Sequence, residues 1–192
     1  MPVTEYLIRN AELYPDEVAL VELNPDEKDT RRTTWKEFDL IQPSANMPYR
    51  REITWSVFNE KANRFANMLI SRGVKKGDKV AILMYNCLEW LPIYFGVLKT
   101  GAIAVPFNFR YDSDEIYYCA ELAQVDVIVF GFAFIGRIEV NAERLLRGRL
   151  LIYVGDNCPS FAESYHELVA DCSSKEPDVK TTKDDSGAIY FS

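Results

Sequence analysis

Histidine and cysteine are scarce in this chain of 192 residues, and their placement excludes several kinds of active site. His166 is the single histidine, and no serine or cysteine elbow accompanies it, so no set of nucleophile, base and orienting residue can be assembled. We therefore expect His166 to be a surface or packing residue, and we assign no catalytic residue. The cysteines show no CxxC spacing, which argues against a zinc site or a disulfide framework and predicts reduced, structural thiols. They are Cys87, Cys119, Cys158 and Cys172.

The sequence also lacks a basic tract, a charged-then-apolar leader and an apolar run long enough to cross a membrane. The formal net charge is -7. Nucleic acids and anionic membrane surfaces carry phosphate and repel such a chain, so neither is expected as the main partner. The start "MPVTEYLIRNAELYPDEVAL" is typical of a cytosolic protein that begins with an amphipathic helix, and we expect a cytoplasmic location with no transmembrane segment.

Two common glycine patterns for binding nucleotides, GxGxxG and GxxxxGK[ST], are absent. Gly131 and Gly136 have the outer spacing of the second pattern, but no lysine follows them. The acidic groups Asp112/Asp114/Glu115 and Asp184-Asp185 lack the spacing of a calcium loop. We interpret them as helix caps and a solvated linker, and we predict no metal site.

Apolar residues make up 48% of the chain and aromatic residues 13%, which suffices to bury a sizeable core. Residues 3–14 have helical spacing, and "EVALVEL" (17–23) is a short strand candidate. The polar segment that follows contains Pro25, Pro43 and Pro48, and we interpret residues 24–52 as an insertion, either lying on the surface or forming a disordered flap.

From Thr54 onward, predicted helices and apolar strands alternate. Thr54 is a good N-cap, and Gly73 supplies the stop of the first long helix. The next helix is expected to start either at Asn86, with Glu89 completing a capping box, or nearer Leu91 because of Pro92, and to end at Gly101. Later helices are expected at 112–123, 134–149 and 160–172, and strands at 78–85, 102–108, 125–130 and 150–155. This alternation predicts an α/β fold: a doubly wound, mainly parallel sheet with helices on both faces.

Ligands of open α/β sheets bind beyond the carboxyl ends of the strands, which directs attention to two loops. Asn86 lies in the first, and Asn108 and Arg110 lie in the second. An exposed arginine beside a cleft can pair with phosphate or carboxylate, although Arg110 can equally form a plain surface salt bridge. Eight aromatic residues can line an acyl pocket or simply fill the core between sheet and helices; we favour the core. They are Trp90, Tyr94, Phe95, Phe107, Phe109, Tyr111, Tyr117 and Tyr118.

Two segments carry a family resemblance. "ITWSVFNEKANRFANML" (53–69) is similar to a helix start of the form Leu-Thr-Tyr-x-Glu-Leu, with Trp55 in place of Tyr and Val57 in place of the acidic residue. "LKTGAIAVPFN" (98–108) is similar to Leu-Lys-Ala-Gly-x-x-x-Val-Pro-hydrophobic-Asp/Asn. With them, residues 1–23 and 53–192 resemble the amino-terminal region of the adenylate-forming superfamily, in particular its long-chain fatty- and aryl-acyl-CoA ligases.

The resemblance implies a two-step reaction. A carboxylate and ATP give an acyl-adenylate and pyrophosphate, and the acyl group then passes to CoA, with Mg²⁺, a phosphate loop and a lysine offsetting the developing charge. The resemblance places Ser192 at the edge of that phosphate loop and all catalytic residues after it. It therefore implies that this chain is part of a longer ligase whose substrate is a fatty or aryl acid. It also implies that the chain is inactive alone.

The resemblance also divides the chain. Residues 1–23 form an amino-terminal helix and strand, 24–52 the insertion, 53–172 the α/β domain, and 173–192 a linker and a strand leading to the phosphate loop. Two other functions stay open at this point: a stand-alone binding or interaction module without catalysis, and a flavodoxin-like receiver or cofactor domain, which lacks the expected acidic triad or glycine loop. We also expect self-association, since strands 17–23 and 188–192 would pair with strands encoded later and so expose edges.

Overall fold

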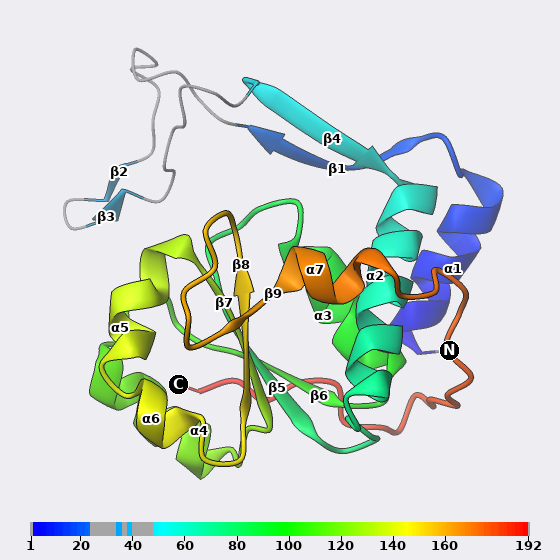
Figure 1. Cartoon of the computed structure of the whole chain (residues 1–192). Coiled ribbons are helices and arrows are strands. Elements are labelled where there is room, and N and C mark those ends of the chain that lie inside the picture. The colour runs from blue at the N-terminus through cyan, green and yellow to red at the C-terminus, as the bar shows by residue number, and fades with distance from the viewer. Residues whose placement is uncertain (1, 24–33, 36–37, 40–47, 192) are drawn as a thin grey trace.

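The computed structural model describes residues 2–23, 34–35, 38–39 and 48–191. A parallel sheet with the strand order β6-β5-β7-β8-β9 lies at the centre, with helices on both of its faces (Figure 1). The fold class predicted from the alternation of helices and strands is therefore confirmed. The sheet strands are β5 (Lys79–Leu83), β6 (Ile103–Pro106), β7 (Val127–Gly131), β8 (Leu150–Val154) and β9 (Glu163–Ser164).

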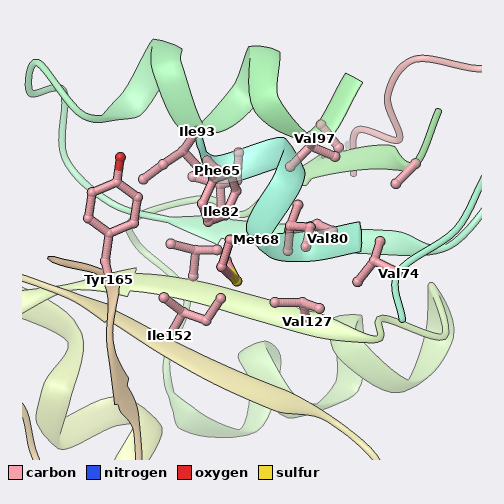
Figure 2. Close-up of a cluster of buried hydrophobic side chains, with 14 of the residues drawn as sticks. Phe65, Met68, Val74, Val80, Ile82, Ile93, Val97, Val127, Ile152 and Tyr165 are labelled. Atoms are coloured by element: carbon pink, nitrogen blue, oxygen red, sulfur yellow. The ribbon is translucent and has the colours of Figure 1, made fainter. Parts of the chain in front are cut away.

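Two separate sets of buried side chains hold the layers together. One set packs the first face of the sheet against α2 (Trp55–Ser71), α3 (Trp90–Lys99) and α7 (Tyr165–Ala170); Figure 2 shows Phe65 and Ile93 from the helices above Ile82 and Ile152 from the sheet. The other set covers the opposite face with α4 (Ser113–Leu122), η1 (Phe132–Phe134), α5 (Ile135–Glu139) and α6 (Ala142–Leu145). Because both faces are covered, the central strands are continuous apolar runs, as expected for parallel strands.

An arm stands apart from this sheet. β1 (Val18–Leu23) pairs antiparallel with β4 (Arg50–Thr54), and α1 (Val3–Leu13) packs beside α2 (Figure 1). The strand expected at 17–23 is thus present, but the expectation that its partner is encoded later in the protein is wrong, since β4 lies within the chain. Residues 50–52, which we assigned to the insertion, belong to this arm. The rest of the predicted insertion lies outside the described residues except for the short pair β2 (Thr34–Trp35) and β3 (Phe38–Asp39).

The capping predictions succeed in two of three helices. Thr54 Oγ1 accepts a hydrogen bond from the amide of Val57, and Asp112 with Glu115 forms a complete capping box at the start of α4. The Asn86/Glu89 capping box is wrong, because α3 starts at Trp90 and Glu89 makes no side-chain cap. The alternative start nearer Leu91 is the better prediction: Pro92 has no N–H and is tolerated in the first helical turn.

Two further predictions need correction. The helix expected at 134–149 is interrupted between α5 and α6 at Val140 and Asn141, where the side-chain amide of Asn141 donates to the carbonyl of Ser113 at 2.9 Å. The helix expected at 160–172 is shorter, because Glu163 and Ser164 pair with β8 before α7 begins.

The segment expected to be a strand at 188–192 forms a single parallel bridge, between Ala188 and Ala104 of β6. Pro106 fits this edge position, since the missing N–H of a proline is tolerated on an edge strand. Residues 173–185 form no helix or strand.

Candidate functional site

A cavity of about 450 Å³ lies at the carboxyl ends of β5, β7 and β8. The chain passes from β5 to β6 on one side and then returns to β7 on the other side, so the order of the strands reverses at β5 and β7. Open α/β sheets bind ligands at such a reversal. The floor consists of residues at or directly after the carboxyl ends of these strands, namely 84–87, 131–134 and 154–156.

The arm and α7 form the walls. Glu22 of β1 accepts hydrogen bonds from Arg51 of β4 at 2.7 Å and from the backbone amide of Leu88 at 2.9 Å. This carboxylate therefore ties the arm to the loop that follows β5. The Nε atom of Arg51 is buried and finds no hydrogen-bond partner among the described residues, so the guanidinium retains one donor in this wall. His166 of α7 completes the lining.

The lining supports binding rather than catalysis. Burial, together with the charge of Glu89, raises the pKa of Cys87 to about 12, so this thiol is protonated and a poor nucleophile. The imidazole of His166 is exposed and lies edge-on to the ring of Tyr165, with 5.4 Å between ring centroids. Among the described lining residues, no nucleophile is paired with a base.

The three predicted ligand residues are not all brought to this cavity. Asn86 lines it. Asn108 and Arg110 lie in the loop after β6, at the same edge of the sheet but outside the lining; Asn108 Oδ1 accepts the amide of Arg110 at 3.0 Å. The guanidinium of Arg110 stacks on the ring of Phe109, 5.7 Å from its centroid.

Sequence reasoning missed several residues of this edge. Arg137 of α5 donates to the carbonyls of Phe109 and Tyr111 at 2.6 and 3.0 Å, and so fixes the loop after β6. Nothing in the local sequence signals these long-range contacts, nor the pair of Glu22 and Arg51. The loops after β7 and β8 could have been included, because the rule applied to β5 and β6 holds for every parallel strand.

The eight aromatic residues do not gather in one pocket. Trp90 and Tyr94 pack on the α2/α3 face of the sheet, whereas Phe107, Phe109 and Tyr117 pack on the α4 face. Tyr118 is 64% exposed. None of the eight lines the cavity at the switch point, so the core interpretation holds for most of them.

Within the described ranges, no three His, Cys, Asp or Glu side chains are grouped so that they could hold a metal ion. Ser192, the predicted edge of a phosphate loop, lies outside the described residues. Among residues 2–23 and 48–191, no helix is long and apolar enough to cross a membrane.

Comparisons with known proteins identify the family. The sequence model for the AMP-binding enzyme family matches residues 7–192. The long-chain-fatty-acid–CoA ligase FadD13 of Mycobacterium tuberculosis is 29% identical over 152 residues, 79% of this chain and 28% of that protein. The crotonobetaine/carnitine–CoA ligase of Salmonella enteritidis is 38% identical over 84 residues, 44% of this chain and 16% of that protein.

A solved structure agrees with this relationship. The anthranilate CoA ligase AuaEII, in complex with anthranoyl-AMP, has a TM-score of 0.78 and 21% identity, and the match covers 98% of this chain and 32% of that one. At this identity the likeness concerns the fold. The chain thus spans less than a third of the length of the ligases that it matches here. Since the family model covers nearly the whole sequence, the chain belongs to the family of AMP-binding enzymes.

Proposed function

We propose that this chain forms the amino-terminal part of an ATP-dependent acyl-CoA ligase. The observation that carries the proposal is the match of residues 7–192 to the AMP-binding enzyme family, since both relatives described above are named as CoA ligases. The proposed reaction joins a carboxylate to AMP with release of pyrophosphate and then transfers the acyl group to the thiol of CoA.

The described residues do not by themselves fit ATP and Mg²⁺. They contain no group of three metal-ligating side chains, and the sequence contains neither of the two glycine patterns that cradle phosphates. We derive no catalytic step from them. We propose instead that residues of the whole ligase outside this chain supply the groups that hold ATP, Mg²⁺ and CoA, and that residues 1–192 are inactive alone.

The carboxylate substrate is proposed to be a fatty acid, on the strength of the name of the mycobacterial relative. The other two relatives are named for crotonobetaine, carnitine and anthranilate, so the test is a competition. The whole ligase is incubated with ATP, Mg²⁺, CoA and an equimolar mixture of short, medium and long fatty acids and aryl acids. Mass spectrometry then shows which thioester forms first; a dominant aryl thioester would refute the fatty-acid assignment.

The loops after β5 and β6 are proposed to border the ligand cleft, with Asn86, Asn108 and Arg110 as contacts. Support comes from their common position at the carboxyl edge of the sheet. If Arg110 pairs with a phosphate or carboxylate of a substrate, Arg110→Ala raises the KM for that substrate about tenfold or more, as expected for a lost charge-assisted contact. Arg147→Ala, at an exposed arginine in the turn that follows α6, is the control.

A stand-alone module without catalysis is the second candidate. The observation that favours it is the cavity at the carboxyl ends of the strands, which can hold a ligand while burial keeps the thiol of Cys87 in its lining protonated. Sequencing the coding region past the codon for Ser192 separates the two: an open frame that continues into a Ser/Thr/Gly-rich loop ending in Pro-Lys supports the ligase, and a natural stop codon supports the module. The four free cysteines are consistent with our proposal of a reducing, cytoplasmic compartment.

Self-association of residues 1–192 is also proposed. The two strands of the arm have only each other as partners among the described strands, and Val18, Val21 and Leu23 of β1 are 44–50% exposed. Such an edge can recruit a second chain. Sedimentation velocity over a wide range of concentrations should reveal a dimer, and a monomer at all concentrations would count against this proposal.

A further inference from the structure

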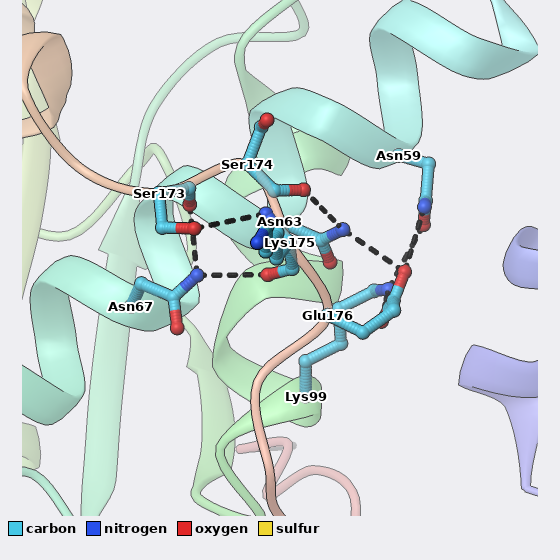
Figure 3. Close-up of polar contacts among 8 residues, drawn as sticks. All are labelled: Asn59, Asn63, Asn67, Lys99, Ser173, Ser174, Lys175 and Glu176. Carbon is cyan, nitrogen blue, oxygen red and sulfur yellow. Dashed lines mark hydrogen bonds and ion pairs between the residues drawn. The ribbon is translucent and has the colours of Figure 1, made fainter.

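Three asparagines and one lysine face the linker that crosses α2 (Figure 3). Asn59, Asn63 and Asn67 are spaced by four residues and therefore share one face of the helix. Lys99 is the last residue of the neighbouring helix α3. We call these four residues and their partners at 173–176 the clasp.

The asparagines bind mainly the backbone of the linker. Asn67 Nδ2 donates to the carbonyls of Ser173 and Lys175, at 2.8 and 2.9 Å. Asn63 Nδ2 donates to the carbonyl of Ser174 at 2.9 Å. The Oδ1 atom of Asn63 is buried and has no partner among the described residues, so the amide is oriented by its donors alone. Backbone carbonyls give little sequence information, and these contacts fix the path of the segment rather than its composition.

Glu176 is the point where all the charged contacts meet. Lys99 Nζ lies 2.5 Å from Glu176 Oε2, and Asn59 and Asn63 donate to Oε1 at 2.7 and 2.9 Å. The side chain of Lys99 is only 2% exposed, whereas that of Glu176 is 40% exposed. A buried ammonium is costly unless it is paired, and here Glu176 and the Oδ1 atom of Asn59 supply the partners.

The clasp lies between two regions that must be brought together. Lys99 is followed by the turn that leads into β6, and Glu176 is followed by the segment that returns to β6. There the amide of Ala104 donates to Gly187 and the amide of Ile189 donates to Ala104, both at 2.9 Å. Between these points, Lys76 Nζ and Asp185 Oδ2 form an ion pair of 2.7 Å, and the lysine side chain is 50% exposed. Exposed ion pairs stabilise a fold only slightly.

We propose that Lys99 is a positioning residue: by holding Glu176 at the end of α3, it determines where residues 187–191 lie beside β6. The consequence for catalysis rests on the proposed function, in which this segment leads into the phosphate loop. A misplaced segment would then shift that loop relative to the sheet. Substrate-positioning errors of this kind cost rate even when the reacting groups are intact.

The test compares Lys99→Met and Glu176→Gln with the control Lys175→Met in the 192-residue chain. Lys175 contributes its carbonyl to the clasp, but the residue is exposed and its side chain forms no ion pair with the described residues, so this control removes a neighbouring charge only. Hydrogen exchange is measured amide by amide by NMR. We expect the amides of Ala104 and Ile189 to exchange at least about tenfold faster in both test variants than in the control, because loss of one partner of a paired, buried charge is costly.

The amides of the central strands β7 and β8 exchange through global unfolding, so their rates give the change in the free energy of unfolding in each variant. The exchange rates of Ala104 and Ile189 are compared after correction for this change. Glu176→Gln keeps the fold testable if Lys99→Met does not fold, since Glu176 is partly exposed. The proposal is overturned if residues 173–176 loosen while Ala104 and Ile189 stay as protected as in Lys175→Met, because the clasp would then act only locally.

The exchange measurement does not depend on catalysis, so its outcome is separate from that of the proposed function. In the whole ligase, Lys99→Met should lower the rate of adenylate formation and Lys175→Met should not. If the wild-type ligase forms no adenylate, the proposed function fails while the positioning role of Lys99 stands on the exchange data. If the exchange data show no coupling, the positioning role fails while the ligase assignment is untouched.

Discussion

The amide of Ile189 donates to the carbonyl of Ala104 at 2.9 Å, and the amide of Ala104 donates to the carbonyl of Gly187. This pairing places the last described segment beside β6, at the edge of a sheet whose other strands all come earlier in the chain. The carboxyl ends of β6 and of this segment lie at the end of the sheet that also carries the cavity and the loops proposed to bind ligand. The predictions below test the packing, charges and chemistry on which that arrangement depends.

Gly96 allows close packing of α3 on α2. A Cβ atom at this position would lie 2.9 Å from the carbonyl oxygen of Ala62 and 2.9 Å from Cδ1 of Phe65. Gly96→Ala should therefore lower the free energy of unfolding by about 1–3 kcal/mol, the usual cost of overpacking. Gly136→Ala is the matched control, since a Cβ there meets nothing within 4 Å and lies in α5. Urea denaturation followed by circular dichroism measures both; equal stability of the two variants would contradict the packing described here.

The capping box of α4 makes a second prediction. Asp112 accepts the amides of Asp114 and Glu115 at 3.0 and 2.8 Å, and Glu115 accepts the amide of Asp112 at 2.9 Å. Asp112→Ala should cost about 1 kcal/mol of unfolding free energy. Asp114→Ala, also in the first turn but without a capping bond from its side chain, should cost less, because it loses only an interaction with the helix dipole. A larger loss for Asp114→Ala in urea denaturation would be inconsistent with the cap.

The charge on Glu176 should make the clasp sensitive to acid. Burial alone would raise the pKa of this carboxyl, but hydrogen bonds from Lys99, Asn63 and Asn59 outweigh it and hold the pKa below its usual value. A carboxyl whose pKa is lower in the folded state stabilises the fold above its ordinary pKa of about 4.3, and this contribution is lost as pH falls through the folded value. The difference in unfolding free energy between the wild type and Glu176→Gln should thus be constant near neutral pH and shrink below about pH 4. A difference that stays constant down to pH 2 would show that the ionised carboxylate of Glu176 does not contribute to stability.

At alkaline pH, deprotonation of Lys99 breaks the ion pair with Glu176. Burial lowers the pKa of its ammonium, and the carboxylate of Glu176 only partly offsets this effect. The ion pair should therefore be lost at a lower pH than an exposed lysine would require. Chemical-shift titration of a ¹³C-labelled Lys99 ε-carbon, in the folded chain and again in urea, compares the two deprotonation midpoints; a folded midpoint at or above the one in urea would contradict the lowered pKa.

The thiol of Cys87 should resist alkylation. With a pKa of about 12, only about one molecule in ten thousand carries the reactive thiolate at pH 8. Iodoacetamide labelling of the folded chain followed by peptide mapping should leave Cys87 unmodified long after it is labelled in urea, and the folded rate should rise as the pH approaches 12. Equal labelling with and without urea at pH 8 would show that the thiol is neither buried nor protonated as described.

The sequence predicted the α/β class because its signals are local. The apolar runs, the glycine stops and the caps at Thr54 and Asp112 are read within one turn or one strand, and these elements appear as expected. The contact of Asn141 with the carbonyl of Ser113, at the break between α5 and α6, was missed because Ser113 is distant in sequence. For the same reason the sequence indicated Asn86 at the site but gave no sign of Glu22 and Arg51, whose positions depend on the pairing of β1 with β4.

The contacts of the linker with α2 and α3 also could not be predicted from the local sequence. Its polar composition indicated residues without helix or strand, which is what the structure has. It gave no hint that Asn63, Asn67 and Lys99 bind this segment, because polar residues on a predicted helix are ordinarily its solvated face. Only the packing of α2 against α3 brings the asparagines and the lysine together.

We propose that this chain is part of an enzyme that forms acyl-adenylates and that residues outside 1–192 are needed for this reaction. Exchange of radiolabelled pyrophosphate into ATP, driven by a fatty acid in the presence of Mg²⁺, measures adenylate formation without requiring CoA. We expect exchange by the whole ligase and none above background by residues 1–192 alone. Exchange by the 192 residues alone would contradict the claim that the catalytic groups lie elsewhere, and absence of exchange by the whole protein with every acid tested would contradict the ligase assignment itself.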